Sequence, residues 1–391
     1  MKSPAFTFWI LLGTFAFLAL HGCRKAGAPA GCEPTGLVVP DTYTFTNPDG
    51  HSTVNFNSQA QRLEMLEEMA AYLKTGNTPG TVLDAGILTA MYENDGHNWL
   101  DAENLGMNGS TKQLKNKTAA SSGTADPTIQ AHFEDLMAAA EALSATTTSG
   151  ITDGGAGQGG VVLSNTSPNV QYLQDAEGRE YVQLIEKGLM GAVFYNQICT
   201  VYLGESKMNV DNTTAVDPEN GEHFTAMEHH WDKAYGYFTT ALDYPSSGTD
   251  RFWGKYAAGR EELLGSASAL SAAFRAGRTA IVAHDLDARD AQIAIIRSEL
   301  ERVAGATAIH YLNNAVSHFT DDALRNHALS EAWAFLEAIP YGHEPALNPA
   351  ELASLLDILG TDFYNVTISN LTSVRDQVAV LLNLDDVKAF L

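Results

Sequence analysis

The chain has 391 residues, 45% of them hydrophobic, so it is long enough to bury one or more sizeable cores. It carries 47 Asp and Glu against 23 Lys and Arg, which gives a formal net charge of −24. This balance argues against nucleic-acid binding and against docking on an anionic lipid surface through a basic patch, because both need many lysines and arginines. It is compatible with solubility and with attraction of cations.

The N-terminus has the pattern of a bacterial secretion signal. Lys2 precedes a largely apolar run over residues 4–20, and the run closes with Leu-His-Gly before Cys23. A short basic start, an apolar middle and a small residue before the cut are typical of such signals. The ending resembles a bacterial lipobox, in which the cysteine carries a lipid; a cleaved signal with an incidental cysteine and a short membrane anchor are the alternatives. The predicted organisation is a lipoprotein signal peptide over residues 1–22, a flexible tether over 23–40 and one helical domain over 41–391.

The first part of that domain combines one hairpin with helices. Two alternating runs flank Asn-Pro-Asp-Gly at residues 47–50, which predicts a small N-terminal β-hairpin over residues 42–56. Residues 155–160 form a GxGxxG sequence, but no strand precedes it and no helix follows, so it is not a nucleotide-binding fingerprint. Helical spacing of apolar residues predicts helices over 59–73, 81–92 and 128–143, with irregular chain over 97–123 and a loop over 146–160.

The second half is predicted to be helical throughout. No charged residue follows Lys187 in the segment ending at residue 203, so this helix should be buried on most sides. The expected fold class is therefore all-α, a helical bundle. Predicted helices cover 181–203, 223–242, 251–274, 286–319 with a possible break near Gly305, 321–339, 350–359 and 373–382.

An internal similarity links two of these helices. His229 and His327 stand 98 positions apart, and each is followed by three residues, a charge and then alanine, aromatic, small and aromatic residues. Each copy also follows a helix that is mainly apolar. We therefore expect a duplicated bundle with two pseudo-repeated helical hairpins, over about 181–242 and 287–339, whose motif helices face a common cleft. A chance likeness between two alanine-rich helices is the alternative.

The motif helices offer histidine and carboxylate ligands. On a helix, Glu228 and Asp232 border one side of the apolar stripe and His230 the other, whereas His229 points away and should be solvated. Imidazole and carboxylate groups from facing helices are how bundles hold metals, although helix-dipole and i,i+4 surface pairing would explain the same residues. The predicted metal ligands are His327, Glu331, His230, Glu228, Asp232 and His310, and the predicted cleft residues are Glu186, Trp231 and Trp333.

The small number of cysteines and the absence of common catalytic motifs argue against several classes of protein. Cys32 and Cys199 are too few for a disulfide framework, and Cys199 lies in an uncharged helical run that predicts burial; their pairing stays open. The sequence has no HExxH, GxSxG or P-loop motif.

Five stretches together carry a resemblance to a known family. The resemblance covers about residues 43–382 and is to a lipoprotein family, a domain of unknown function, common in marine Bacteroidetes-type bacteria. That family is similar to the imelysin-like proteins, which are duplicated all-α lipoproteins or periplasmic proteins found with iron-uptake systems. The stretches are residues 52–62, 65–68, 115–122, 228–236 and 327–331.

The imelysin-like proteins have a short Gly-x-His-x-x-Glu motif at a cleft between two helical bundles. His327 and Glu331 are similar to it, with one more residue between them and with Asn326 before the histidine. The resemblance implies the duplicated architecture and a role beside iron uptake. It further implies iron, zinc or haem as the bound species, and outer-membrane or periplasmic uptake components as partners.

The leading hypothesis is therefore a non-enzymatic binding lipoprotein of the cell envelope, facing the periplasm or the surface, in iron or haem acquisition. A metal-dependent, peptidase-like hydrolase is one alternative. A glycan- or nutrient-binding lipoprotein is another, because aromatic side chains could stack on sugars, although helical spacing favours their burial. The residues in question are Trp231, Tyr235, Tyr237, Trp253 and Trp333.

Overall fold

A computed structural model describes residues 38–121, 124–246 and 250–391. The chain is mostly helical, as predicted, with two small two-stranded antiparallel sheets. The predicted signal peptide, Cys23, Cys32 and nearly all of the tether lie outside the described residues. Within those residues, no helix combines the length and the apolar character needed to cross a membrane. The α-helices are α1 (Asn57–Lys74), α2 (Ala85–Glu93), α3 (Pro127–Ser144), α4 (Tyr181–Leu189), α5 (Glu205–Met208), α6 (Ala226–Phe238), α7 (Phe252–Gly259), α8 (Glu261–Leu264), α9 (Ser266–Val282), α10 (Leu286–Ser317), α11 (Asp322–Ala338), α12 (Pro349–Leu359) and α13 (Ile368–Leu381).

The chain also contains short 3₁₀ turns and two π-helices. Two consecutive π-helices continue α4, and such wide turns are frequent at functional sites. The whole segment from α4 through these turns is almost entirely buried, as the missing charges predict. The 3₁₀ turns are η1 (Thr75–Asn77), η2 (Met107–Gly109), η3 (Lys115–Lys117), η6 (Pro218–Asn220), η7 (Ile339–Tyr341) and η8 (Phe363–Asn365), and the π-helices are η4 (Met190–Tyr195) and η5 (Gln197–Tyr202).

The strands are not where the sequence predicts them. Residues 42–56 form a loop with one isolated bridge, between Thr46 and Ser52, instead of a hairpin. Next to this bridge the Thr53 N–H donates to the Phe45 carbonyl, so the chain does turn back at the predicted position. The pairing extends no further: the Tyr43 N–H donates to the Leu242 carbonyl, and the Asn55 N–H donates to the Asp232 carboxylate. The observed sheets pair β1 (Gly160–Leu163) with β2 (Gln171–Gln174), and β3 (Ala215–Asp217) with β4 (Glu222–Thr225).

Several helix boundaries also differ from the prediction, among them the start of α2 at Ala85 and the start of α13 at Ile368. The segment 251–274 is divided into α7, α8 and the start of α9, with Gly265 at a positive φ of 68° between the last two. Helix α10 runs unbroken through Gly305, where an added Cβ would come within 2.0 Å of Leu382. A glycine is therefore required there by close packing against the C-terminal segment, and not by a helix break. Helix α6 begins only at Ala226, because β4 takes up residues 222–225.

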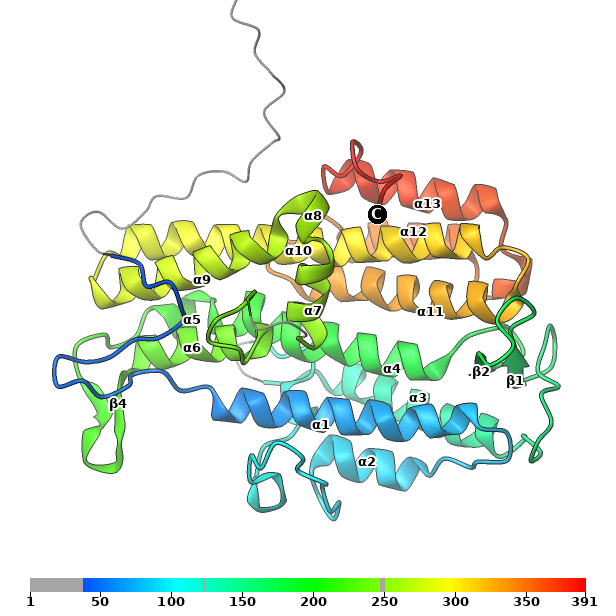
Figure 1. Cartoon of the computed structure of the whole chain (residues 1–391), viewed down its shortest axis with the longest axis horizontal. Helices are drawn as coiled ribbons and strands as arrows, with labels where there is room; N and C mark the ends of the chain where they lie inside the picture. Colours follow the sequence, from blue (N-terminus) through cyan, green and yellow to red (C-terminus); the bar gives the residue numbers. More distant parts are fainter. Residues whose placement is uncertain (1–37, 122–123, 247–249) are drawn as a thin grey trace, which may run out of the picture. The chain divides into compact units, whose positions relative to one another are not determined.

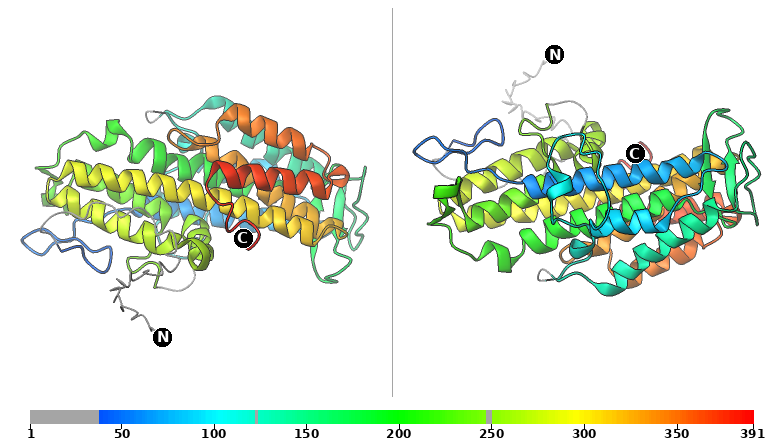
Figure 2. Two further views of the ribbon diagram at one scale, coloured as in Figure 1. Left: turned by 90° about the horizontal axis from the view of Figure 1, so that it is seen from above. Right: turned by 90° about the horizontal axis from the view of Figure 1, so that it is seen from below.

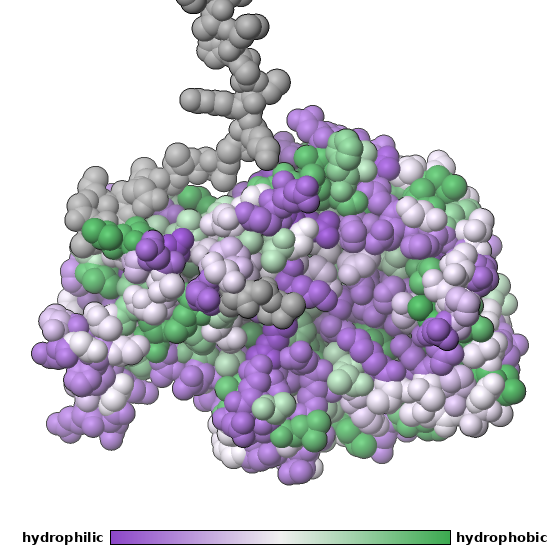
Figure 3. Space-filling model, viewed as in Figure 1, coloured by the Kyte–Doolittle hydropathy of each residue, from purple (hydrophilic) through white to green (hydrophobic). Residues whose placement is uncertain are grey.

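The helices lie in layers around α4 and its π-helical continuation (Figure 1). In that view α1 and α2 lie below, and α9 and α10 lie above with α11, α12 and α13 on the right; α3 lies behind α1. The views from above and below agree, with β1 and β2 at the end of the bundle where α11 and α13 gather (Figure 2). One hydrophobic core connects these layers. Hydrophilic residues predominate on the face in Figure 3, where hydrophobic residues lie in small separate groups.

Candidate functional site

A row of charges of alternating sign, buried except for the exposed Lys74 at one end and the half-buried His327, crosses the contact between α4 and α11. We name it the charge row, and it consists of Lys74, Glu186, Lys187, Glu331, His327 and Glu180 in that order. The successive nitrogen–oxygen distances along the row are 2.9, 2.8, 4.0, 3.7 and 2.6 Å. Three sequence-predicted site residues, Glu186, His327 and Glu331, therefore do lie together.

Local structure fixes the end of the row that contains His327 and Glu180. Glu180 precedes the first turn of α4, and its backbone N–H donates to the Ser330 hydroxyl of α11. His327 Nδ1–H donates to the Glu180 carboxylate at 2.6 Å, while Tyr172 of β2 stacks on the imidazole with ring centroids 4.1 Å apart. The i,i+4 spacing on α11 places Glu331 on the other ring nitrogen.

The charges in the row stabilise one another in their ionised forms. Burial opposes ionisation of His327, but Glu180 raises the pKa of His327 above its ordinary value. Burial likewise opposes the charge of Lys187, but Glu331 and Glu186 raise the pKa of Lys187. On the acid side, Lys187 and Lys74 overcome burial and lower the pKa of Glu186. The row is therefore a set of ion pairs in which the protonated form of His327 is favoured, and not a set of open ligands.

A pocket of about 210 Å³ opens beside the Lys74 end of the row, and we name it the α7 pocket. Its walls come from α1, α4, α7 and the residues just before α7. Lys187 reaches it with a side chain that is only 7% exposed, whereas Lys74 at 49% is open to solvent. The charged side chains that line the pocket are Glu67, Lys74, Glu186, Lys187, Asp250, Arg251 and Lys255.

Two charged residues that line the α7 pocket, Asp250 and Lys255, form no ion pair within the described residues. Lys255 is exposed, and its ammonium approaches only the ring of Tyr256, 5.9 Å from the centroid. Asp250 accepts a hydrogen bond from the backbone N–H of Arg251 at 2.7 Å. Burial raises the pKa of the Asp250 carboxyl. Between them Phe252 has a φ of +49°, a left-handed conformation that is costly for a bulky residue and is often found at binding sites.

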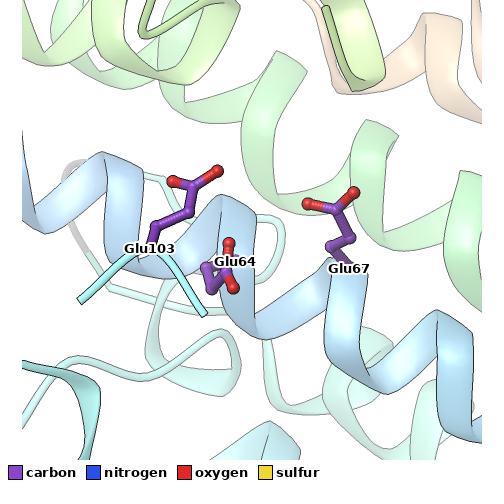
Figure 4. A group of neighbouring side chains, drawn as sticks. All are labelled: Glu64, Glu67 and Glu103. Carbon is purple, nitrogen blue, oxygen red and sulfur yellow. The ribbon is translucent and has the colours of Figure 1, made fainter. Parts of the chain in front are cut away.

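Three carboxylates meet beside this pocket, and Figure 4 shows them converging from α1 and the loop at residue 103. Oxygens of Glu64, Glu67 and Glu103 lie within 4.8 Å of one another, a spacing that a metal ion could bridge. Arg251 already takes that place, since its guanidinium pairs with the three carboxylates at 2.9, 2.6 and 3.0 Å. The cluster therefore anchors the segment before α7 to α1.

The other predicted carboxylates belong to a separate buried network. Arg278 of α9 donates to Glu228 at 2.7 Å and to Asp232 at 3.0 Å. Asp232 also accepts from the Tyr43 hydroxyl at 2.8 Å. Glu228 completes a capping box with Thr225 at the start of α6. The prediction that these two carboxylates share a hollow with His327 is wrong, because α6 packs on α1 and α9 while α11 packs on α4 and α10.

The remaining predicted histidines also lie apart from the charge row. His230 faces Tyr202 of η5, with ring centroids 6.0 Å apart. His310 hydrogen-bonds Asn314 at 3.0 Å, and burial and then Arg260 lower the pKa of His310. His229 is half-buried and stacks on Phe224 instead of facing solvent as predicted.

The two tryptophans predicted for the cleft do not reach it. Trp231 is fully buried, and its indole N–H donates to the Phe274 carbonyl at 3.0 Å. Trp333 is half-buried and packs on Phe363, with ring centroids 5.8 Å apart. Trp253 is also fully buried, so these side chains fill the core as their helical spacing favours.

The sequence did not reveal Glu180, Lys187 or Arg251 as members of this region. Glu180 and Arg251 stand outside the helices that carried the motifs, and their partners are 147 and 184 to 187 positions away. Lys187 was visible only as the last charge before the apolar run. A lone lysine at the edge of a buried helix is the one signal that could have predicted a buried ion pair there.

At least four larger cavities lie elsewhere among the described residues, and two of them exceed 500 Å³. One of about 520 Å³ beside α10 is lined by Arg289 and Arg297, which donate to main-chain carbonyls. The other, of about 590 Å³, lies between α12 and α13 and is mainly apolar. Neither contains a predicted site residue, so we take the α7 pocket with the charge row as the candidate site.

The chain matches a family described as Domain of unknown function (DUF4856) over residues 40–382. This covers most of the chain, which therefore belongs to that family, and it confirms the predicted membership of a family of unknown function. No curated protein and no solved structure matches the chain.

Proposed function

We propose that this member of the DUF4856 family is a non-enzymatic binding protein whose α7 pocket takes a small organic molecule with both a carboxylate and an ammonium group. The single observation that carries the proposal is the set of lining charges of both signs, of which Asp250 and Lys255 take part in no ion pair with any residue that the structure describes. A ligand ammonium would approach Asp250, and a ligand carboxylate would approach Lys255.

The volume of the pocket supports a small ligand. Sites for drug-sized molecules measure about 300–1,000 Å³, and the α7 pocket measures about 210 Å³. The charge row and Arg251 supply a rigid wall, since their side chains are already held by ion pairs. A pre-organised polar wall loses little conformational entropy when a ligand binds.

The same contacts favour an organic ligand over iron, zinc or haem. His327, Glu331 and Glu186 would have to release their ion-pair partners, and His327 a proton, before any of them could bind a metal. Glu228 and Asp232 would have to release Arg278. Relation to the imelysin-like proteins and a role in iron uptake therefore rest on the sequence resemblance, and we keep them as the wider context of the proposal.

Neither alternative function gains a specific observation. The hydrolase needs a metal with an open coordination position, and the candidate carboxylates are paired with arginine or lysine. Stacking on sugars needs exposed aromatic faces, and Trp231, Tyr235, Tyr237 and Trp253 are buried.

The location that goes with this function is the cell envelope. The signal-like start of the chain, and the lipobox-like sequence at Cys23, support a lipid anchor followed by a short tether. The binding domain would then work beside uptake components of the outer membrane or the periplasm. Mass spectrometry of the mature N-terminus tests this part: a diacylglycerol on Cys23 is expected, and an unmodified cysteine or an uncleaved signal would contradict it.

Binding is tested by isothermal titration calorimetry with the twenty L-amino acids and glycine betaine as probes. We expect at least one zwitterion to bind with a Kd below about 1 mM, about −4 kcal/mol. Asp250→Asn and Lys255→Ala should each weaken that binding at least tenfold.

The control is Lys388→Ala, which removes a partly exposed lysine near the C-terminus that does not line the pocket. It should bind like the wild type. The proposal fails if no zwitterion binds, or if both pocket variants bind as tightly as the control.

A further inference from the structure

The structure assigns this chain a second binding site, a half-buried basic cluster that takes a small multivalent oxyanion such as a phosphate or polycarboxylate group. The site is independent of the α7 pocket. The basic cluster consists of Arg62, Lys112, Lys117, Lys207, His230 and Lys233.

The cluster is assembled from segments far apart in the sequence. Arg62 comes from α1, Lys117 from η3 and Lys207 from α5, while His230 and Lys233 stand three positions apart on α6. Tyr202 of η5 joins them: the Lys233 ammonium lies 5.8 Å from its ring centroid, and the His230 ring lies 6.0 Å away. Positive charge gathered from four helical elements and from Lys112 in a loop is not explained by any one helix.

None of its lysines has an anionic partner among the described residues. No ion pair involves Lys112, Lys117, Lys207 or Lys233 there, and no carboxylate acts on Lys117. Arg62 donates to the carbonyls of Gln113 and Ser58, and no carboxylate pairs with it among the described residues. In a chain with 47 carboxylates and a net charge of −24, such a group of cations would be expected to attract side-chain partners.

The paired neighbour on the same turn makes the contrast specific. Lys115 of η3 binds Glu93 at 2.6 Å and Glu134 at 2.5 Å, and these partners raise the pKa of Lys115. Lys117 stands two residues later without any carboxylate. Burial and then the charges of Arg62 and Lys207 lower the pKa of Lys117 to about 8.

Lys233 behaves in the same way. Burial and then the charge of Lys117 lower its pKa to about 8, and burial with Lys233 lowers the pKa of His230 to about 4. Half-buried lysines that repel one another cost folding free energy, so their arrangement calls for a compensating anion.

Unpartnered polar atoms lie at the same place. His230 Nδ1 is buried and has no hydrogen bond within the described residues. Gln197 of η5 is fully buried; its amide donates to the Lys117 carbonyl at 3.2 Å, while its own oxygen is unpartnered. Both residues belong to or face the π-helical turn η5, a kind of turn frequent at functional sites.

The negative charge of the rest of the chain favours a small anion over a large polyanion as the ligand of the basic cluster. A nucleic acid or an anionic membrane would bring much of the acidic surface close to further negative charge, which the net charge of −24 opposes. A small oxyanion meets only the basic cluster. Several lysine ammonium groups suit an anion with more than one negative charge, because each contributes a separate point charge.

The test is thermal unfolding and isothermal titration calorimetry at pH 7 with pyrophosphate and citrate as probes. Sodium chloride at matched ionic strength serves as the screening control. We expect pyrophosphate or citrate to raise the melting temperature and to bind with a Kd below about 1 mM. Preference for pyrophosphate would identify a phosphate ligand, and preference for citrate a polycarboxylate.

Three variants decide the location of the site. Lys117→Met and Lys233→Met should each weaken anion binding at least tenfold, and both should fold, because each removes a repelled charge. Lys115→Met is the matched control on the same turn and should bind like the wild type. Equal stabilisation by sodium chloride, no binding of either anion, or an equal loss in the Lys115→Met variant would overturn the proposal. A zwitterion that still binds Lys233→Met would show that the α7 pocket is separate.

Discussion

The charge row and the basic cluster bury charge in opposite ways within one bundle. In the charge row each cation has a carboxylate beside it, down to the 2.6 Å contact of His327 with Glu180. In the basic cluster Lys117 and Lys233 face other cations. Ions removed from water are tolerated when they are paired and hydrogen-bonded, and are costly otherwise. The row therefore supports the fold, whereas the cluster needs something that the chain itself does not provide.

Removing a cation from the charge row should change the free energy of unfolding the most. Within the described residues, Lys187→Met leaves the buried Glu186 paired with the exposed Lys74, and the buried Glu331 beside His327. We expect the free energy of unfolding to fall by about 3 kcal/mol, since a buried pair has lost one partner. Chemical denaturation measures it. The exposed Lys255→Met is the control and should change stability by less than about 0.5 kcal/mol; equal effects would contradict the contrast.

Removing one lysine of the basic cluster should raise the free energy of unfolding, by less than the charge-row substitution lowers it. Lys233→Met removes a repelled cation, so we expect the free energy of unfolding to rise by about 1 kcal/mol without added anion. The paired Lys115→Met should instead lower it by up to about 1 kcal/mol. Denaturation of both variants in a phosphate-free buffer provides the comparison. A loss of stability in Lys233→Met would show that the cluster is satisfied after all.

The pH dependence sharpens the same comparison. The folded pKa of His327 lies above its unfolded value of about 6.5, so its contribution is complete below that pH and is lost as the pH rises through the folded value. The folded pKa of Lys117 and Lys233, about 8, lies below the unfolded value of about 10.4, so the cluster should gain stability as pH rises between these values.

Stability curves from pH 5 to pH 10 measure both effects. The wild type should exceed His327→Gln by more at pH 5.5 than at pH 9. It should approach the stability of Lys233→Met as the pH rises from 8 to 10. The reverse trend in either difference would contradict the assignment of paired and unpaired charge.

Added metal should have the smallest effect. Because Arg251 occupies the space among Glu64, Glu67 and Glu103, we expect 100 μM zinc, ferrous iron or calcium to add less than about 0.4 kcal/mol. That value corresponds to a Kd no tighter than the metal concentration. Arg251→Ala should free the carboxylates and increase the effect. Strong stabilisation of the wild type would restore the metal hypothesis.

Sequence patterns predicted most of the helices and part of the site. Periodicity located α1, α3, α10, α11 and α12 closely, because each buries one apolar face in regular helix. The spacing of His327 and Glu331 likewise brought out a local pair. The hairpin predicted at residues 42–56 is reduced to one antiparallel bridge, because its outer residues bind α6: Tyr43 stacks on Tyr235 with centroids 3.6 Å apart.

The remaining features depend on contacts that no local pattern contains. Glu180 meets His327 across 147 positions, and the basic cluster joins residues from 62 to 233. The net charge even argued against a basic patch, because a sum over the chain does not show where charges gather. Only the fold brings Lys117 beside Lys233.

The most direct test of the contrast is a measurement of individual lysine pKa values by NMR of ¹³C-labelled lysine side chains, assigned by single Lys→Met variants. We expect Lys117 and Lys233 to titrate near pH 8, and Lys115 and Lys187 above the ordinary lysine value. Adding pyrophosphate should raise the pKa of Lys117 and Lys233 alone. Titration of all four lysines at or above about 10.4, with no response to the anion, would contradict the account.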